Sequence, residues 1–278
     1  MPTVKVNGYD LYYEDNDFTD PWRPSQVVFL NHYGYGNLRL YYKWIPILGR
    51  EYRVVRMDRR GFGRSQAPPF GYELTVEDML SDWAGFLDAL GISRVHFIGD
   101  RFGGSVGAAF AATYPERVRS LIMIGSPMHT QRVKHLFGPG AETVLEEGSW
   151  LDANKTWARR PEGLDGGFED RLKALYGREQ MAMIPPHILS AFRRLSVKPE
   201  FTIESVLAQI RAPTLLLSPD AAEPLLTNEE QAFMRDTIPN CEQVVFPGAN
   251  HDIAYLQDEK CAQLALDFIR KHSGQDVV

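Results

Sequence analysis

The feature of the sequence with the clearest chemical meaning is a turn centred on an arginine. Val95 to Asp100 is a short apolar run typical of a buried strand, and a segment rich in Ala and Gly follows it. Gly99 and Gly103 lie two residues either side of Arg101. This spacing lets strand and helix approach closely and projects the central side chain into a pocket, as a nucleophile requires. A guanidinium has no usable lone pair and stays protonated, so Arg101 is expected to hold that position without acting as a nucleophile.

Asp100 is the other residue of the turn that could attack a substrate. For Asp100 to be the central residue, the register would have to shift by one position. Ile98 and Phe102 would then stand where the close approach requires glycines. We therefore reject Asp100 as the nucleophile.

With these residues the chain resembles the α/β-hydrolase family, and the resemblance covers essentially its whole length. The segment from Asp58 to Ser65, DRRGFGRS, is similar to the family's D-x-R-G-x-G-x-S turn. It lacks the third glycine of a dinucleotide fingerprint, and we expect it to support the site without doing chemistry. Gly248 to His251 is similar to the histidine loop that follows the family's last strand. The resemblance implies that His251 occupies the histidine position of a nucleophile–acid–histidine triad.

The resemblance also implies an acid after a late strand, and two carboxylates qualify. The apolar run Leu215 to Leu217 is followed by Asp220 and by Glu223. Family members usually place the acid just before an apolar residue or a proline, which favours Glu223 before Pro224. Asp220, closer to the strand end, stays open as the alternative.

The oxyanion site implied by the family combines two backbone N–H groups. One is that of Phe102, and the other comes from the loop after the strand predicted over 26–31. Tyr33, Gly34 and Tyr35 could each supply it; we prefer Tyr35, with Gly34 next. Tyr33 is expected to line the substrate pocket.

Arg101 leaves three hypotheses open. In the first, the chain is a serine-type hydrolase, of the carboxylic-ester or C–C bond type and with an ester- or lactone-type substrate, that has lost its nucleophile, so acyl-enzyme chemistry is absent. In the second, His251 acts as a general base without a covalent intermediate, in a lyase-like or cofactor-free oxygenase-like reaction, and Arg101 binds an anionic substrate group. In the third, the protein binds a ligand and catalyses nothing. Because a buried cation needs a partner, Glu223, Asp100 or an anionic ligand is expected beside Arg101.

The elements that would position these residues alternate between strands and helices. That alternation predicts an α/β fold with a mostly parallel sheet covered on both faces; the resemblance implies eight strands. An antiparallel hairpin is predicted around Asn7-Gly8, and an amphipathic helix over 74–90 with Thr75 as its N-cap. Residues 1–125 and 211–278 are expected to form the hydrolase core. Residues 126–210 are expected to form a helical cap, whose Trp150 and Trp157 would contact an apolar or aromatic substrate or pack in the cap's own core.

Composition narrows the classes of partner. The chain has 278 residues, 44% of them hydrophobic, and a formal net charge of -6, which argues against a nucleic-acid or anionic-membrane surface. No signal-peptide pattern or membrane-spanning apolar run is present in the sequence, so a cytoplasmic location is expected. Its two cysteines, Cys241 and Cys261, fit no metal or redox spacing, and we expect neither a metal nor another cofactor. The expected partner is a small-molecule substrate, and the protein is expected to be a monomer or homodimer.

Overall fold

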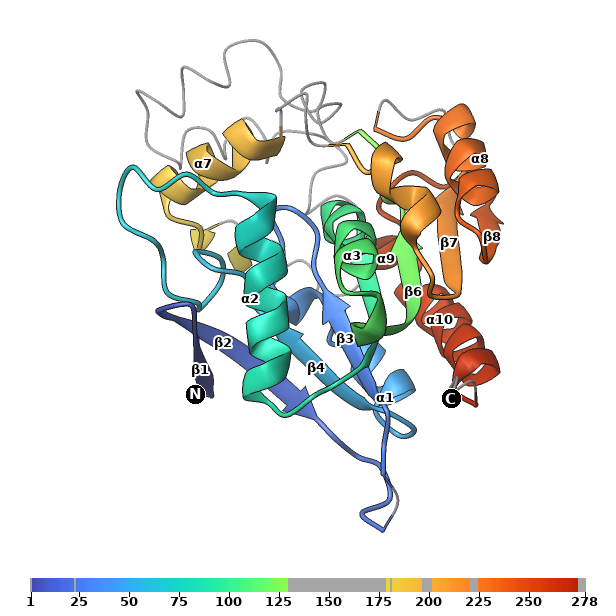
Figure 1. Ribbon diagram of the computed structural model, residues 1–278, viewed down its shortest axis with the longest axis horizontal. Helices are drawn as coiled ribbons and strands as arrows, with labels where there is room; N and C mark the ends of the chain where they lie inside the picture. Colours follow the sequence, from blue (N-terminus) through green and yellow to red (C-terminus); the bar gives the residue numbers. More distant parts are fainter. Residues whose placement is uncertain are drawn as a thin grey trace.

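The computed structural model describes residues 2–22, 24–129, 179–180, 182–196, 202–220 and 225–274. These residues form one sheet with helices on both of its faces (Figure 1). The strands are β1 (Thr3–Val6), β2 (Tyr9–Asn16), β3 (Val27–Asn31), β4 (Arg53–Met57), β5 (Val95–Asp100), β6 (Val118–Ile124), β7 (Thr214–Pro219) and β8 (Cys241–Phe246). The fold is therefore of the α/β class, as the sequence predicts.

The sheet has eight strands in the order β1-β2-β4-β3-β5-β6-β7-β8. β2 pairs antiparallel with β1 and with β4, and every other neighbouring pair is parallel. The central strand β5 is buried along its whole length between β3 and β6. Its carboxyl end therefore lies in the middle of the sheet, where crossover loops from several strands meet.

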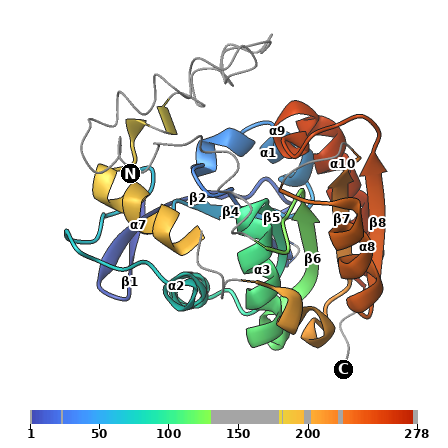
Figure 2. The same cartoon turned by 90° about the horizontal axis from the view of Figure 1, so that it is seen from above.

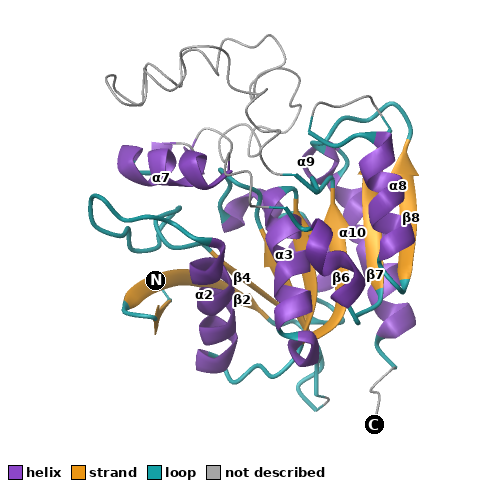
Figure 3. Ribbon diagram, turned by 45° about the horizontal axis from the view of Figure 1, so that its top comes forward, coloured by secondary structure: helices purple, strands orange, loops and turns teal. Residues whose placement is uncertain are grey.

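The helices and 3-10 helices of the described ranges are η1 (Leu38–Tyr41), α1 (Trp44–Leu48), α2 (Val76–Ala89), α3 (Phe102–Thr113), η2 (Pro115–Arg117), α7 (Pro186–Ser196), η4 (Glu204–Gln209), α8 (Asn228–Thr237), α9 (Ile253–Leu256) and α10 (Asp258–His272). Figure 2 shows α2, α3 and α8 on one face of the sheet, and α1 and α10 together on the other. In Figure 3, α7 lies above α2, on the side of the molecule where the parallel strands have their carboxyl ends. Within the described ranges, every helix is too short or too polar to traverse a lipid bilayer.

Local sequence explains where these elements begin and how closely they pack. Thr75 caps α2 with a full capping box, in which its hydroxyl accepts from the amide of Asp78 and the Asp78 carboxylate accepts from the amide of Thr75. α3 packs on β5 through glycines: a Cβ on Gly107 would lie 2.4 Å from the Phe97 ring. The small residues after β5 therefore bring the start of α3 directly against the strand.

The predicted hairpin, the predicted strands and the helix capped by Thr75 are all present in the structure. Two features were not predicted from the sequence: the short elements η1 and α1, and the separate short helix α9 before α10. Most of the expected cap, 126–210, lies outside the described residues, so its boundaries remain a prediction.

Candidate functional site

Arg101 lies between β5 and α3 in a backbone conformation that side chains rarely adopt. Its φ is 49° and its ψ is -115°, and its amide donates to the Ile124 carbonyl at 2.8 Å. The flanking glycines make this turn possible. A Cβ on Gly99 would lie 2.5 Å from the Gly103 carbonyl oxygen, and one on Gly103 would lie 2.5 Å from the His32 carbonyl oxygen. The turn is held by close packing on both sides of Arg101.

The Arg101 side chain is enclosed by groups of the chain itself. Its Nη1 donates to Asp252 Oδ1 at 2.7 Å, and its Nε lies 3.7 Å from Asp100 Oδ1. The guanidinium carbon lies 3.7 Å from the centre of the Tyr33 ring. Burial alone would lower the pKa of Arg101, but Asp252 and Asp100 outweigh it and raise that pKa. The guanidinium is therefore a permanent cation whose charge the protein itself neutralises.

Asp100 is the buried member of this charge cluster. It is 2% exposed, and its Oδ2 accepts from the Tyr41 hydroxyl at 2.9 Å. Burial raises the pKa of Asp100 to about 6, although Arg101 and the Tyr41 hydrogen bond act in the opposite direction. Of the three partners foreseen for Arg101, the structure thus brings Asp100 beside it.

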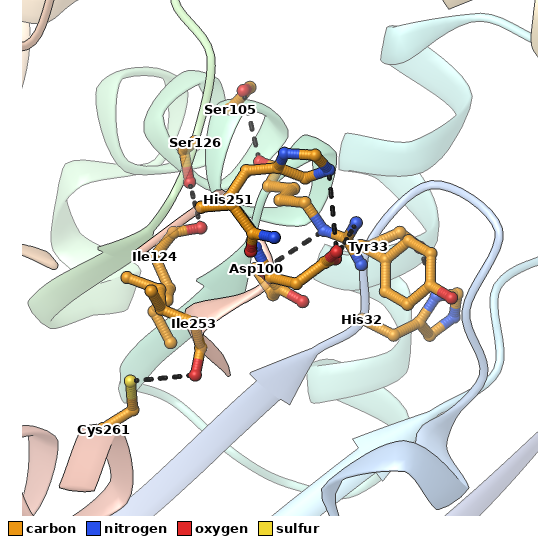
Figure 4. Close-up of polar contacts among 12 residues, drawn as sticks. His32, Tyr33, Asp100, Ser105, Ile124, Ser126, His251, Ile253 and Cys261 are labelled. Carbon is orange, nitrogen blue, oxygen red and sulfur yellow. Dashed lines mark hydrogen bonds and ion pairs between the residues drawn. The ribbon is translucent and has the colours of Figure 1, made fainter. Parts of the chain in front are cut away.

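His251 lies after β8 and reaches the same cluster through Asp252. Its Nε2 is 3.9 Å from Asp252 Oδ2, and its side chain is 14% exposed. Its backbone packs on the end of β6, where a Cβ on Gly125 would lie 2.9 Å from the His251 carbonyl oxygen. Figure 4 shows His251, Asp100 and Tyr33 gathered at the ends of the strands. One carboxylate, that of Asp252, therefore stands between the arginine and the imidazole.

Arg59 holds the loop proposed to supply an oxyanion donor. It is 3% exposed, and its Nη2 donates to the carbonyl oxygens of Tyr33 at 2.8 Å and Gly34 at 2.5 Å. Burial lowers the pKa of Arg59 to about 9. In a planar trans peptide the N–H points opposite to the C=O, so the bond to the Gly34 carbonyl also fixes the direction of the Tyr35 N–H. The DRRGFGRS segment thus supports this loop from beneath.

The loop and the start of α3 meet under α7. A Cβ on Gly34 would lie 2.7 Å from the Phe192 ring and 3.8 Å from the Cβ of Phe102. Phe192 also packs edge-on against Phe102, with ring centres 4.8 Å apart, and against Tyr35 at 5.1 Å. The candidate oxyanion residues Phe102, Gly34 and Tyr35 are therefore neighbours, and an aromatic side chain of α7 covers them.

Tyr33 connects this site to the residues that precede α7. It is 7% exposed, and its hydroxyl accepts a hydrogen bond from Gln180 Nε2. Burial raises the pKa of Tyr33 to about 12, so it is a neutral phenol at pH 7. Its ring supports the Arg101 guanidinium, so the predicted pocket-lining residue also contacts the charge cluster.

Of the two candidate acids, the structure describes Asp220 and not Glu223. Asp220 is exposed and its Oδ2 accepts from the Gly248 amide at 3.3 Å, so it fastens the histidine loop. Glu223 lies outside the described residues, as do Trp150 and Trp157, and their roles remain predictions. Among the residues that the structure describes, no group of three His, Cys, Asp or Glu side chains could hold a metal ion.

Asp252 is the site residue that reasoning from the sequence missed. It follows His251 directly, and its position in a loop gave it no more weight than any solvated carboxylate. The contact with Arg101 spans 151 positions of the chain. An acid adjacent to the loop histidine, in a chain with a cation at position 101, is the signal that could have found it.

Comparisons with known proteins agree with this architecture. The family model described as the alpha/beta hydrolase fold matches residues 26–258. A putative carbamate hydrolase RutD from Stutzerimonas stutzeri is 28% identical over 95% of this chain and 98% of its own length. A 2-hydroxy-6-oxo-2,4-heptadienoate hydrolase from Pseudomonas putida is 43% identical over 82 residues, which is 30% of this chain and 29% of that protein.

Solved structures show the same fold. A malate-bound thermophilic esterase from Thermogutta terrifontis has a TM-score of 0.77 and 26% identity, covering 98% of this chain and 100% of that one. An enol-lactonase from Burkholderia xenovorans has a TM-score of 0.79 and 19% identity, covering 97% of this chain and 100% of that one, a likeness of fold alone. The sheet order, the family match and these relatives agree: the chain belongs to the α/β-hydrolase fold family.

Proposed function

We propose that this protein is a hydrolase-type enzyme for a small apolar or aromatic ester or lactone that works without an acyl-enzyme. The observation that carries the proposal is the guanidinium at the β5–α3 turn, held 2.7 Å from Asp252. No hydroxyl or thiol stands at that position to form a covalent intermediate. Relatives named as hydrolases support a small-molecule substrate, and the structural neighbours named as an esterase and an enol-lactonase are the reason for choosing an ester or lactone.

The route left to the site is direct attack by water. His251 is the general base that removes a proton from the water as its oxygen adds to the substrate carbonyl. The tetrahedral adduct then collapses and breaks the C–O bond to the leaving alcohol, which takes the proton back from His251. The backbone N–H of Phe102, with one from the 33–35 loop, stabilises the negative charge that develops on the carbonyl oxygen. The expected acceleration is small, ~10³–10⁴-fold over water, which is what remains when a triad loses one member.

Stopped-flow hydrolysis of 4-nitrophenyl acetate tests this proposal. The native chain is expected to show slow, linear release of nitrophenol with no burst, and His251→Ala should slow it further. Arg101→Ser should introduce a burst whose size equals the enzyme concentration. A stoichiometric burst from the native chain would refute the absence of an acyl-enzyme.

A second candidate is a ligand-binding protein without catalysis. Its specific support is the position of Asp252, which lies 3.9 Å from His251 Nε2 and 2.7 Å from Arg101 Nη1, so a carboxylate stands on the side of the imidazole that faces position 101. For this candidate, the native chain and His251→Ala hydrolyse the ester equally slowly.

A further inference from the structure

We infer that Arg101 is a receptor for the carboxylate of a small organic acid, and that Asp252 occupies the receptor until such an acid displaces it. The inference rests on the proposed function to the extent that hydrolysis of an ester or lactone yields a carboxylate at this place. The inference assigns Arg101 a ligand class, a small monocarboxylate, and gives it no part in bond making or breaking.

Arg101 makes one hydrogen bond to a carboxylate, fewer than the two that a guanidinium can make to a single ligand. A guanidinium binds a carboxylate most strongly through two parallel N–H···O bonds. In the described part of the chain, the hydrogen bond from Arg101 to a carboxylate comes from Nη1 alone, at 2.7 Å. By contrast, Arg53 holds Asp15 through both Nε and Nη2, at 3.0 and 2.7 Å. Asp252 therefore holds Arg101 through one hydrogen bond, whereas a free carboxylate can form two parallel ones.

The two carboxylates beside Arg101 differ in how easily they can leave. Asp100 is 2% exposed and tied to Tyr41, so it stays in place. The Asp252 side chain is 36% exposed. The Asp252 backbone is fixed independently, because its amide donates to Asn250 Oδ1 at 2.9 Å. Asp252 can rotate its side chain into solvent while the histidine loop keeps its shape.

The Tyr33 ring prepares the guanidinium for a planar ligand. With the guanidinium carbon 3.7 Å from the ring centre, one face of the cation is covered. A carboxylate must then approach the edge of the guanidinium, where its N–H groups point. Asp100 remains near Nε and keeps the cation compensated during the exchange.

Charge sets the direction of the exchange. With Asp100 and Asp252 ionised, the cluster carries one positive and two negative charges, and a third carboxylate is repelled until Asp252 leaves. Removing the Asp252 charge should therefore open the receptor permanently.

Calorimetric titration with benzoate, in a carboxylate-free buffer at pH 7, tests the inference. Asp252→Asn is expected to bind benzoate at least tenfold more tightly than the native chain, and Asp252→Ala should behave alike if the asparagine variant folds poorly. Benzamide has nearly the same shape and no charge, so its affinity should be the same in all variants.

The double variant Arg101→Met/Asp252→Asn is the matched control, and it should lose the gain. Equal benzoate affinity in Asp252→Asn and the native chain, or a gain that survives in the double variant, would overturn the inference. Because the readout is equilibrium binding, a failure here is distinct from a failure of the proposed hydrolysis, which is read from ester turnover.

Discussion

Arg101→Ser should destabilise the protein more at pH 7 than at pH 5. The reason is Asp100, a carboxylate that is 2% exposed and whose nearest cation is Arg101. With Arg101 present, the pKa of Asp100 is about 6, so at pH 7 the carboxylate is mostly ionised in the folded protein. Without Arg101, the pKa of Asp100 rises further and the folded protein must keep this group protonated.

The magnitude follows from linkage. If Arg101→Ser raises the pKa of Asp100 well above 7, the lost stabilisation at pH 7 is limited by the one unit that separates 7 from about 6. One unit corresponds to ~1.4 kcal/mol in the free energy of unfolding. At pH 5 Asp100 is mostly protonated with or without Arg101, so this contribution nearly vanishes. Lost packing, and the strained φ that both residues share, act equally at both pH values and cancel in the difference.

Urea unfolding of both proteins at pH 5 and pH 7 measures this difference. Asp100→Asn provides the control background: there the cost of Arg101→Ser should no longer contain the Asp100 contribution, and the difference between the two pH values should shrink. An equal cost at both pH values in the native background, or a larger cost at pH 5, would refute the charge argument.

The remaining predictions concern stability. Burial raises the pKa of Asp58 and of Asp100 to about 6 each, so the folded state binds more protons than the unfolded state between about pH 4 and 6. The stabilisation from these two protonated carboxyl groups is fully present below pH 4 and is lost as the pH rises through 6. Urea unfolding should therefore give a lower free energy of unfolding at pH 7 than at pH 5, and Asp58→Asn should reduce this difference. Gly63→Ala would place a Cβ 2.1 Å from Asp58 Oδ2 at a φ of 53°, and it should lower the free energy of unfolding by more than ~3 kcal/mol. Gly71→Ala, at a φ of 83° with nothing within 4 Å, should lower it by only ~1–2 kcal/mol. Equal midpoints of the two variants in thermal melts would contradict this. Asp82→Asn breaks a buried ion pair with Arg60 and should lower the free energy of unfolding by ~3–5 kcal/mol. Asp15→Asn breaks a partly exposed ion pair with Arg53 and should lower it by ~1 kcal/mol or less. Similar losses in the two variants would show that burial is not the deciding factor.

The core of the fold could be predicted from the sequence because its signals are local. The apolar run before Arg101 and the turn at Asn7-Gly8 need no distant partner to be interpreted. Thr75 caps α2 as predicted, since a capping box uses groups three residues apart. The short α1 escaped prediction because Pro46 and few turns give it no clear periodicity, and its place is set by packing against α10.

The candidate site could be predicted only in part. Reasoning from the sequence, together with the family resemblance, pointed to the β5–α3 turn, the His251 loop and the 33–35 loop, and the structure brings these segments together. The partner of Arg101 was harder, because an ion pair depends on three-dimensional distance and several carboxylates were available. Asp100 was among those named. Asp252 was not, although it makes the shorter contact.

The strained turn at Arg101 does not by itself argue for catalysis. A residue with φ of 49° and ψ of -115° costs of order 1–3 kcal/mol and persists only where its surroundings determine it. Here the surroundings do so without help from position 101: Gly99 packs on Gly103, and Gly103 packs on the His32 carbonyl. Any residue at position 101 would be forced into the same bend, so the bend by itself is not evidence of chemistry at this position. The evidence for function at this position must come from the charges. A cation that the protein neutralises with one fixed and one movable carboxylate differs from an ordinary buried salt bridge, because the movable carboxylate, Asp252, is also the group that faces His251. Whether Asp252 stays or leaves therefore decides both what Arg101 can bind and whether a carboxylate stands beside the imidazole.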